Sequence, residues 1–257
     1  MKYFDTHAHY NDEQYDKDID TVIKKCRDVG VDKFVNVGYN KEASIKAIEI
    51  ANKYEGFYSA IGVHPHDVEN DSATDIYDIY MKNKDDKKIV AIDEIGYDFA
   101  FVKDNKEKQK KLFIEQIELA NHLKLPILIH SRDASLETYN TLKEKRAEYG
   151  TLFHCFQPSD DLVRLVLENG YFVAFGGNIT FKRNESFKKY IDMIPLDKIV
   201  IETDSPYLSP EPYRGKRNDS SNLPIICKKL AEYKGEEEEK VAKIIYDNSL
   251  KFFKINP

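Results

Sequence analysis

Eight short runs rich in β-branched and aromatic residues alternate with longer amphipathic segments, and this alternation constrains the fold of the chain more than any other feature. Such a pattern is typical of β-strand and α-helix units around a parallel sheet. The runs are KYFDTH from Lys2, KFVNVG from Lys33, FYSAIGV from Phe57, KIVAIDEI from Lys88, PILIH from Pro126, TLFHC from Thr151, YFVAF from Tyr171 and KIVIETD from Lys198. Because eight such strands close a barrel, the sequence predicts an α/β fold of the (β/α)8 TIM-barrel type.

The segments between the runs have the apolar spacing of helices. One stripe contains Ile19, Val22, Ile23 and Cys26, and another contains Leu112, Phe113, Gln116, Ile117 and Ala120. Two more helices are expected near residues 225–233 and 239–253. The acidic run 236–239 is interpreted as a solvated helix start, where the helix dipole favours negative charge, rather than as a functional acidic patch. His122 is interpreted as an ordinary residue near a helix C-terminus.

The length of 257 residues matches a single barrel of roughly 250 residues, although two smaller domains would also fit. No low-complexity linker interrupts the alternation. We therefore expect one barrel domain over residues 1–257. With 41% hydrophobic and 33% charged residues, the chain can bury a core and solvate its surface, which excludes a disordered polymer.

Cysteine usage, the N-terminus and net charge limit the cellular setting. Cys26, Cys155 and Cys227 are widely spaced and form no CxxC pair, which fits a reducing cytoplasm. The start of the chain, MKYFDTHAHY, lacks the apolar core of an export signal. The uncharged stretch 170–181 is too short to span a bilayer, so no membrane attachment is expected. A net charge of −6 argues against a broad basic surface for nucleic acid, so a phosphate-bearing partner must be bound locally.

Metal-binding side chains recur at the C-terminal ends of the expected strands. They are His7 and His9 after the first strand, His64 and His66 after the third, Glu94 at the fourth, His130 at the fifth, His154 at the sixth and Asp204 at the eighth. In a (β/α)8 barrel these ends meet at one face, where active sites form. A lone histidine at a strand end is usually structural. The presence of so many metal-binding side chains at the strand ends favours a single metal site.

The spacing also suggests how two ions are held. Alternate residues of a strand share a face, so His7 and His9 can grip one ion together. Glu94 can bridge two cations with its two oxygens, while His130 and His154 complete the second ion's shell and Asp204 the first ion's. We therefore expect two divalent cations, with Mg2+, Mn2+, Co2+ and Zn2+ all compatible. Such a pair activates water and suits displacement at phosphorus.

Further residues are expected to support this site. Glu202, two residues before Asp204, faces the barrel interior one layer lower, where it can orient a ligand histidine. Asp5 has the same relation to His7. The loop SPYLSPEPYRGKRN delivers Arg214, Lys216 and Arg217, and Arg132 adds a charge over the same mouth. A run such as RGKR is often a solvated loop tip, but its position over the site favours phosphate binding.

At this point the motifs resemble those of the TatD-type metal-dependent deoxyribonucleases of the amidohydrolase-like superfamily. The resemblance rests on FDTHAHYN, AIGVHPHD, IVAIDEIGYDF, LPILIHSRDA, FHCF and IETDSPYLSPEPYRGKRN, in order from residue 4 to past 218. It implies a metal-dependent nuclease that hydrolyses DNA phosphodiester bonds, with exonuclease behaviour on single strands. It assigns His7, His9, Glu94 and Asp204 to one cation and Glu94, His130 and His154 to the other. It further implies that His64 is a phosphate-binding or catalytic histidine and Glu202 a catalytic-site acid.

Three positions depart from the family pattern without removing a ligand. Asp93 stands where a glycine usually precedes the bridging glutamate, Tyr97 replaces the usual leucine, and Gln157 belongs to HCFQPS, which replaces a serine-glycine version of that loop. All three lie next to the site. They therefore bear on substrate selectivity and on packing at the fourth strand.

The sequence thus predicts a metal-dependent deoxyribonuclease in which a metal-activated water attacks phosphorus. Asp204, or Glu202 behind it, accepts a proton, and Arg132, Arg214 and Arg217 steady the phosphate. Single-stranded DNA is the expected partner, with no obligate protein partner. One alternative is a hydrolase of a carbonyl ester or amide, such as a D-aminoacyl-tRNA deacylase, since metal hydroxide serves either reaction. Another is a non-catalytic, metal-dependent scaffold in DNA processing.

Overall fold

The computed structural model of this chain describes residues 1–100 and 104–256. Its parallel strands are β1 Tyr3–Ala8, β2 Val31–Val37, β3 Phe57–Ile61, β4 Ile89–Asp98, β5 Ile127–Arg132, β6 Thr151–Phe153, β7 Phe172–Phe175 and β8 Ile199–Ile201. They are hydrogen-bonded in chain order from β1 to β8. The helices are α1 Ile19–Asp28, α2 Lys41–Lys53, α3 Ala73–Lys82, α4 Lys106–Leu123, α5 Ser135–Glu144, α6 Asp160–Asn169, α7 Phe187–Met193, α8 Leu223–Lys234 and α9 Glu238–Phe253.

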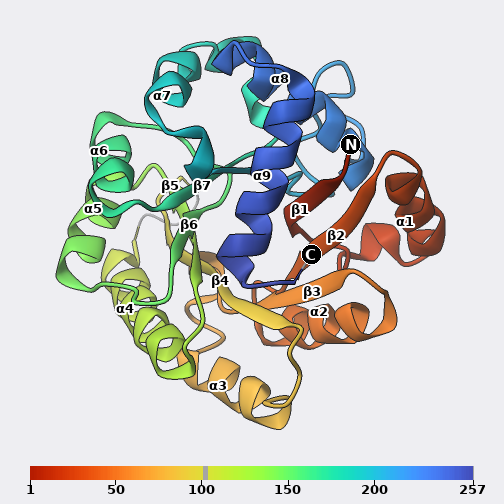
Figure 1. Ribbon diagram of the computed structural model, residues 1–257. Helices are drawn as coiled ribbons and strands as arrows, with labels where there is room; N and C mark the ends of the chain where they lie inside the picture. Colours follow the sequence, from red (N-terminus) through yellow and green to blue (C-terminus); the bar gives the residue numbers. More distant parts are fainter. Residues whose placement is uncertain (101–103, 257) are drawn as a thin grey trace.

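The ends of the sheet meet between β1 and the segment after β8. Ala8 pairs with Ser205 in a parallel bridge, the backbone N–H of His9 donates to the carbonyl oxygen of Ser205 at 2.7 Å, and that of Asp204 donates to His7 at 2.9 Å. The eight strands therefore form a nearly closed barrel with its helices around it (Figure 1). The predicted (β/α)8 fold is confirmed.

The fourth strand is longer than the sequence suggested. It continues past Glu94 to Asp98, because Ile95–Asp98 pair with Ile129–Arg132 of β5 after a register shift between Ile92 and Ile95. Glu94 therefore lies within β4 rather than at its end. The extra residues carry a second carboxylate, Asp98, toward the same mouth of the barrel.

Local sequence explains where several helices begin and end. Asn40 and Ser159 each cap a helix by accepting a backbone N–H with the side chain, and Ser72 forms a capping box with Asp75. Gly170 ends α6 with φ of 64°, a conformation that favours glycine. The acidic run 236–239 lies at the exposed start of α9, as predicted.

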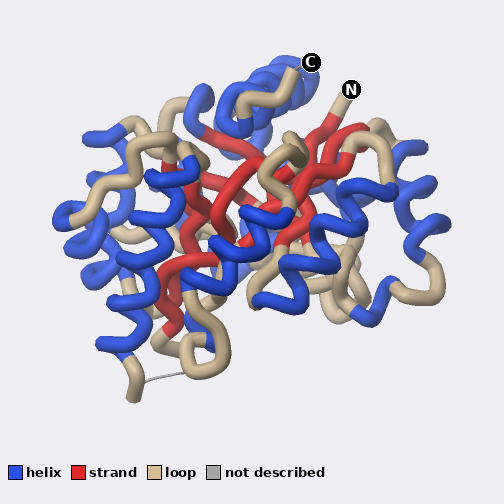
Figure 2. Tube along the Cα trace, turned by 90° about the horizontal axis from the view of Figure 1, so that it is seen from below, coloured by secondary structure: helices blue, strands red, loops and turns tan. Residues whose placement is uncertain are grey.

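Two layers of apolar side chains form the core. The larger layer lies between the sheet and the surrounding helices. The smaller layer fills the barrel interior with residues such as Phe4 and Val35, and α9 closes it with Tyr246, Leu250 and Phe253. The ring centroids of Phe4 and Phe253 are 5.8 Å apart. In Figures 1 and 2, α9 lies across this end of the strands, so the opposite, C-terminal end remains for a site.

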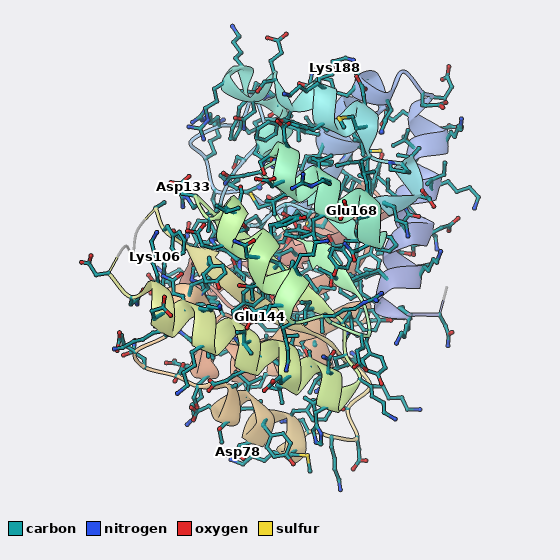
Figure 3. All side chains as sticks on the ribbon, turned by 90° about the vertical axis from the view of Figure 1, so that its left-hand side faces the viewer. Asp78, Lys106, Asp133, Glu144, Glu168 and Lys188 are labelled. Carbon is teal, nitrogen blue, oxygen red and sulfur yellow. The ribbon has the colours of Figure 1, made fainter. Side chains whose placement is uncertain are left out.

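The outer face of the helices is polar. Figure 3 views the flank formed by α3 to α7, from which charged, exposed side chains project outward, one from each successive helix: Asp78, Lys106, Glu144, Glu168 and Lys188. Within the two described ranges, no helix has both the length and the apolar character that a membrane span requires.

Candidate metal centre

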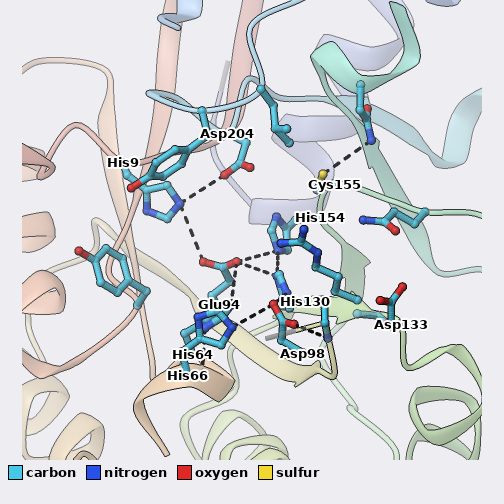
Figure 4. A pocket seen from close by; sticks show the side chains of 18 of the residues that line it. His9, His64, His66, Glu94, Asp98, His130, Asp133, His154, Cys155 and Asp204 are labelled. Carbon is cyan, nitrogen blue, oxygen red and sulfur yellow. Dashed lines mark hydrogen bonds and ion pairs between the residues drawn. The ribbon is translucent and has the colours of Figure 1, made fainter. Parts of the chain in front are cut away.

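A cavity of ≈ 750 Å³ opens at the C-terminal end of the barrel. Its walls include five predicted ligands, His9, Glu94, His130, His154 and Asp204, together with His64 and Arg132. The remaining predicted ligand, His7, is fully buried beside His9. The structure thus brings together histidines and carboxylates from six strands or strand ends (Figure 4).

Glu94 lies at the centre of this cluster. Its Oε1 atom is 2.9 Å from both His130 Nδ1 and His154 Nε2. Its Oε2 atom is 3.9 Å from both His7 Nε2 and His9 Nε2. One carboxylate oxygen therefore faces each of two histidine pairs, and Figure 4 shows Glu94 between His9 on one side and His130 and His154 on the other.

Asp204 completes the group around His7 and His9. Its Oδ1 atom lies 3.4 Å from His9 Nε2 and 3.8 Å from His7 Nε2. The backbone of Asp204 is left-handed, with φ of 56°, a conformation that aspartate tolerates better than most residues. Its N–H donates to His7, and its carbonyl oxygen accepts from Tyr207 at 2.8 Å. On the far side of the His9 ring, Nδ1 lies 3.1 Å from the carbonyl oxygen of Val37.

The spacing of the histidine nitrogens fits metal ligation. His7 Nε2 and His9 Nε2 are 3.2 Å apart, and His130 Nδ1 and His154 Nε2 are 3.0 Å apart. For a metal–nitrogen distance of about 2.0–2.1 Å, neighbouring ligands of a tetrahedral or octahedral ion are separated by about 2.9–3.4 Å. The groups His7–His9–Asp204 and His64–Glu94–His130 each have donor atoms within 4.8 Å of one another. The residues present therefore suit divalent cations.

Carboxylates lie at the far nitrogens of two of these histidines. Asp93 Oδ2 is 3.1 Å from His7 Nδ1, and Asp98 Oδ2 is 3.2 Å from His130 Nε2. A carboxylate at this position fixes the ring orientation and the tautomer of a ligand histidine. Neither aspartate was among the predicted site residues. The alternation of β4 would have indicated Asp98, four residues after Glu94, had the strand been extended that far.

Glu202 lies beneath His154 rather than in the cavity. It is fully buried, its Oε1 accepts the backbone N–H of Cys155, and the same atom is 3.9 Å from His154 Nδ1. The sequence predicts that Glu202 orients a ligand histidine, and His154 is the histidine beside it. Glu202 does not line the cavity, so contact with a substrate there would require a rearrangement.

Asp5 does not take the role that its spacing suggested. Its carboxylate accepts hydrogen bonds from the Thr203 hydroxyl at 2.6 Å and the Ser220 hydroxyl at 2.5 Å. It meets His7 only at the backbone N–H, at 3.4 Å. Asp5 therefore ties β1 to the segment after β8 and leaves the His7 ring to Asp93.

The four histidines differ in pKa in the metal-free protein. Burial alone would lower the pKa of His9, but its hydrogen bond to Asp204 and the charge of Glu94 raise it to about 9. Burial acts on His130 in the same way and is outweighed by hydrogen bonds to Asp98 and Glu94, so its pKa is also about 9. Burial lowers the pKa of His7 to about 4. Burial, together with electrostatic repulsion between its protonated ring and that of His7, lowers the pKa of His154.

The two carboxylates of the cluster are held in their ionised form. Burial favours the neutral acid of Glu94, yet electrostatic interactions with His154 and His64 and hydrogen bonds with His130 and His154 hold its pKa well below the usual value. Burial likewise opposes ionisation of Asp204, but its hydrogen bond to His9 lowers the pKa. The centre therefore presents anionic oxygens to cations.

His64 faces the same cavity with a defined tautomer. Its Nδ1 accepts the backbone N–H of His66 at 3.1 Å, so in the neutral ring Nε2 carries the proton. Burial lowers the pKa of His64 well below its usual value, which keeps the ring neutral. Nε2 lies 3.7 Å from Glu94 Oε1, and it is a hydrogen-bond donor toward the cavity. His66 Nε2 is 3.1 Å from Asp98 Oδ2.

The three predicted arginines occupy different surroundings. Arg132 lines the cavity. Arg214 stacks over the ring of Phe181, with its guanidinium carbon 4.4 Å from the ring centroid. Arg217 is bound by both oxygens of Asp18, at 3.0 and 2.6 Å, and does not line the cavity. The structure thus brings one of the three to the cavity itself and holds Arg217 elsewhere.

Several other residues that line the cavity were not predicted from the sequence. Arg183 follows β7 in the short helix Lys182–Asn184, lines the cavity and lies 5.7 Å from the centroid of Phe181. Tyr39 and Tyr207 flank His9 with ring centroids 5.6 and 6.1 Å away. None of the three residues lies in a strand or a long helix, so no periodicity marks them. The basic pair KR in FKRN was the available signal.

The fold and this donor set define a metal-dependent hydrolase of the (β/α)8 barrel class. The family model for TatD related DNase matches residues 4–254. The chain therefore belongs to the TatD family.

Relatives match over nearly the whole chain. The uncharacterized metal-dependent hydrolase YabD of Bacillus subtilis is 39% identical, covering 98% of this chain and 99% of that protein. Human deoxyribonuclease TATDN3 is 32% identical, with 97% and 93% covered. The crystal structure of the TatD homologue YjjV from Escherichia coli superposes with a TM-score of 0.92 at 26% identity, covering 99% and 98%.

Proposed function

We propose that this chain is a deoxyribonuclease that uses two divalent cations and removes nucleotides from the ends of single-stranded DNA. The observation that carries the proposal is the position of Glu94, whose two oxygens face two separate histidine pairs. A bridging carboxylate between two nitrogen-rich sites suits a pair of ions a few ångströms apart, the arrangement used for displacement at phosphorus.

The ligands divide between the two ions as follows. The first ion would be held by His7, His9, Asp204 and Glu94 Oε2, and the second by Glu94 Oε1, His130 and His154. Mixed imidazole and carboxylate ligands are compatible with Mg2+, Mn2+ or Zn2+. Bound cations would polarise the phosphodiester and make water a stronger nucleophile.

The protein's own groups supply the remaining steps. Asp204 lines the cavity and is ionised, so it accepts the proton of the attacking water. His64 donates a hydrogen bond from Nε2 to a phosphate oxygen, since its other ring nitrogen is occupied. Glu202 is a positioning residue, because it reaches the cavity only through His154.

The cationic and aromatic side chains of the cavity suit a nucleic acid strand. Arg132 and Arg183 supply guanidinium groups for a phosphate, with Arg214 beside them on Phe181. Tyr39 and Tyr207 offer aromatic rings on which a base can stack. The name of human TATDN3, a deoxyribonuclease, supports DNA as the substrate. Because Arg217 is bound to Asp18, we propose no phosphate contact for it in this conformation.

The test is metal reconstitution followed by a substrate panel. The protein is stripped with a chelator and reloaded separately with Mg2+, Mn2+ or Zn2+. It is then given end-labelled linear single-stranded DNA, circular single-stranded DNA, duplex DNA, RNA and D-aminoacyl-tRNA. We expect progressive shortening of linear single strands and none of circles. Cleavage of circles would refute the exonuclease mode, turnover of D-aminoacyl-tRNA alone would identify a deacylase, and metal binding without any turnover would identify a scaffold.

A further inference from the structure

Two adjacent carboxylates on β4 reach toward the same histidine. Asp93 and Glu94 are neighbours, and neighbouring residues of a regular strand point to opposite faces. Here both lie near His7, with Asp93 Oδ2 3.1 Å from its Nδ1 and Glu94 Oε2 3.9 Å from its Nε2. The register shift between Ile92 and Ile95 falls at these two residues and accounts for the shared direction.

We propose that Asp93 is a positioning residue that holds His7 in the orientation and tautomer needed to bind the first ion. With the Nδ1 proton directed at Asp93, the lone pair of Nε2 faces His9 and the cavity. Asp93 thereby strengthens metal binding at one of the two sites without touching the ion. This inference rests on the two-ion centre proposed above.

Among the described residues, the Asp93 carboxylate and the Nδ1 atom of His7 have only each other as partners. Asp93 is fully buried, and within residues 1–100 and 104–256 neither of its side-chain oxygens has a hydrogen bond to another group. The same holds for His7 Nδ1. The His7 ring is also stacked on His154, with centroids 4.1 Å apart and planes 8° apart. A buried carboxylate without another donor is costly, so the pairing with His7 gives Asp93 a reason to be there.

The second ion has an equivalent pair. Asp98 Oδ2 lies 3.2 Å from His130 Nε2, on the side of the ring away from Glu94. Each of the two histidine groups thus contains a histidine whose far ring nitrogen lies within 3.2 Å of an aspartate oxygen. If both pairs act in this way, Asp93 and Asp98 affect different ions, and their removal must weaken different binding events.

Asp5 offers a matched control. Like Asp93, it is a fully buried aspartate close to His7. Its carboxylate, however, bonds to Thr203 and Ser220 and not to the His7 ring. Asp5→Asn therefore removes a buried charge of the same kind from the same region while leaving the Asp93–His7 pair intact.

The experiment measures Mn2+ binding to the full-length, metal-stripped protein by calorimetry. We expect two Mn2+ ions per wild-type chain. Asp93→Ala should weaken one of the two binding events by about 10–100-fold, the usual effect of removing such a partner. Asp93→Asn, whose amide oxygen still accepts a hydrogen bond from His7 Nδ1–H, should have an affinity between those of the wild type and Asp93→Ala. Asp98→Asn should weaken the other binding event, and the variant that combines Asp93→Ala with Asp98→Asn should weaken both. Asp5→Asn should lower the melting temperature while leaving both affinities unchanged.

Two outcomes separate this inference from the proposed metal centre. If wild-type protein binds no Mn2+, the metal centre itself is wrong. If wild type binds two ions and folded Asp93→Ala binds both with wild-type affinity, only the role of Asp93 is refuted.

Should Asp93→Ala fail to fold, the near-isosteric Asp93→Asn variant provides the binding measurement. The ring ¹⁵N spectrum of His7 in Zn2+-loaded wild-type protein gives a second readout, because the proposal requires a proton on Nδ1 while Nε2 faces the ion. An unprotonated Nδ1 would overturn it.

Discussion

Loading the metal-free protein with cations is expected to release protons from two histidines. His9 and His130 have pKa values of about 9, so both rings are charged at neutral pH. A ring nitrogen must be unprotonated to bind a metal, and binding therefore displaces protons. His7 and His154 have lowered pKa values, so they are already neutral and release none.

The number of protons follows from the titration curve. At pH 7.5 a group with a pKa of about 9 is roughly 97% protonated, so the two rings together release about 1.9 protons. At pH 9.5 the same group is about 24% protonated, and the release falls to about 0.5. Between these pH values the release from the two histidines should therefore drop by about 1.5 protons.

Calorimetry in buffers of different ionisation enthalpy measures this number directly. The observed heat of Mn2+ binding is plotted against the buffer's ionisation enthalpy, and the slope gives the protons released. Burial raises the pKa values of Asp93 and Glu202, so their ionisation can add up to two protons. Repeating the titration with Asp93→Asn and Glu202→Gln removes that contribution.

The reasoning fails if these variants release almost no protons at pH 7.5. It also fails if the release does not decrease between pH 7.5 and pH 9.5. Either result would mean that Glu94, Asp98 and Asp204 do not hold His9 and His130 in their charged forms. The histidines would then be available to metal at neutral pH without proton exchange.

Four other outcomes are expected. The pKa values of His9 and His130 in the folded protein exceed the unfolded value of about 6.5, so both histidines stabilise the metal-free fold fully below pH 6.5 and lose this effect as the pH rises to 9. Urea unfolding of the metal-free protein should therefore show a loss of up to about 3 kcal/mol of unfolding free energy per histidine between these pH values. Glu94→Gln should reduce turnover of single-stranded DNA at least about 100-fold while circular dichroism stays native, and near-native turnover would disprove the bridging role. Arg183→Gln should raise KM and reduce the salt slope of DNA binding by about 0.7, with an unchanged melting temperature. Phe253→Ala should cost about 3–5 kcal/mol in unfolding free energy but keep the metal stoichiometry, since α9 lies at the opposite end of the barrel.

The barrel and the clustering of its candidate ligands were predictable because both follow from periodicity. Alternation places His7 and His9 on one face, and the parallel strands bring Glu94 and Asp204 to the same mouth. The observed nitrogens of His7 and His9 are 3.2 Å apart, as a shared ion requires. Arg183 could not be found in this way, because it lies in an irregular segment after β7 whose path is set by tertiary packing.

Asp5 and Asp93 show where alternation stops being informative. On β1, alternation predicts that Asp5 and His7 share a face, but the register shifts between Asp5 and Ala8, and Asp5 accepts hydrogen bonds from Thr203 and Ser220 of the segment after β8. On β4, Asp93 should point away from Glu94, yet the register shift brings both toward His7. The first case depends on which donors the barrel closure places nearby, and the second on a local irregularity of pairing. Both are consequences of closing eight strands into a ring, and neither is encoded in the spacing of a single strand. The identity of Asp93 is nevertheless a local signal: a carboxylate at a fully buried position requires a partner, and the nearest ring nitrogen is that of His7.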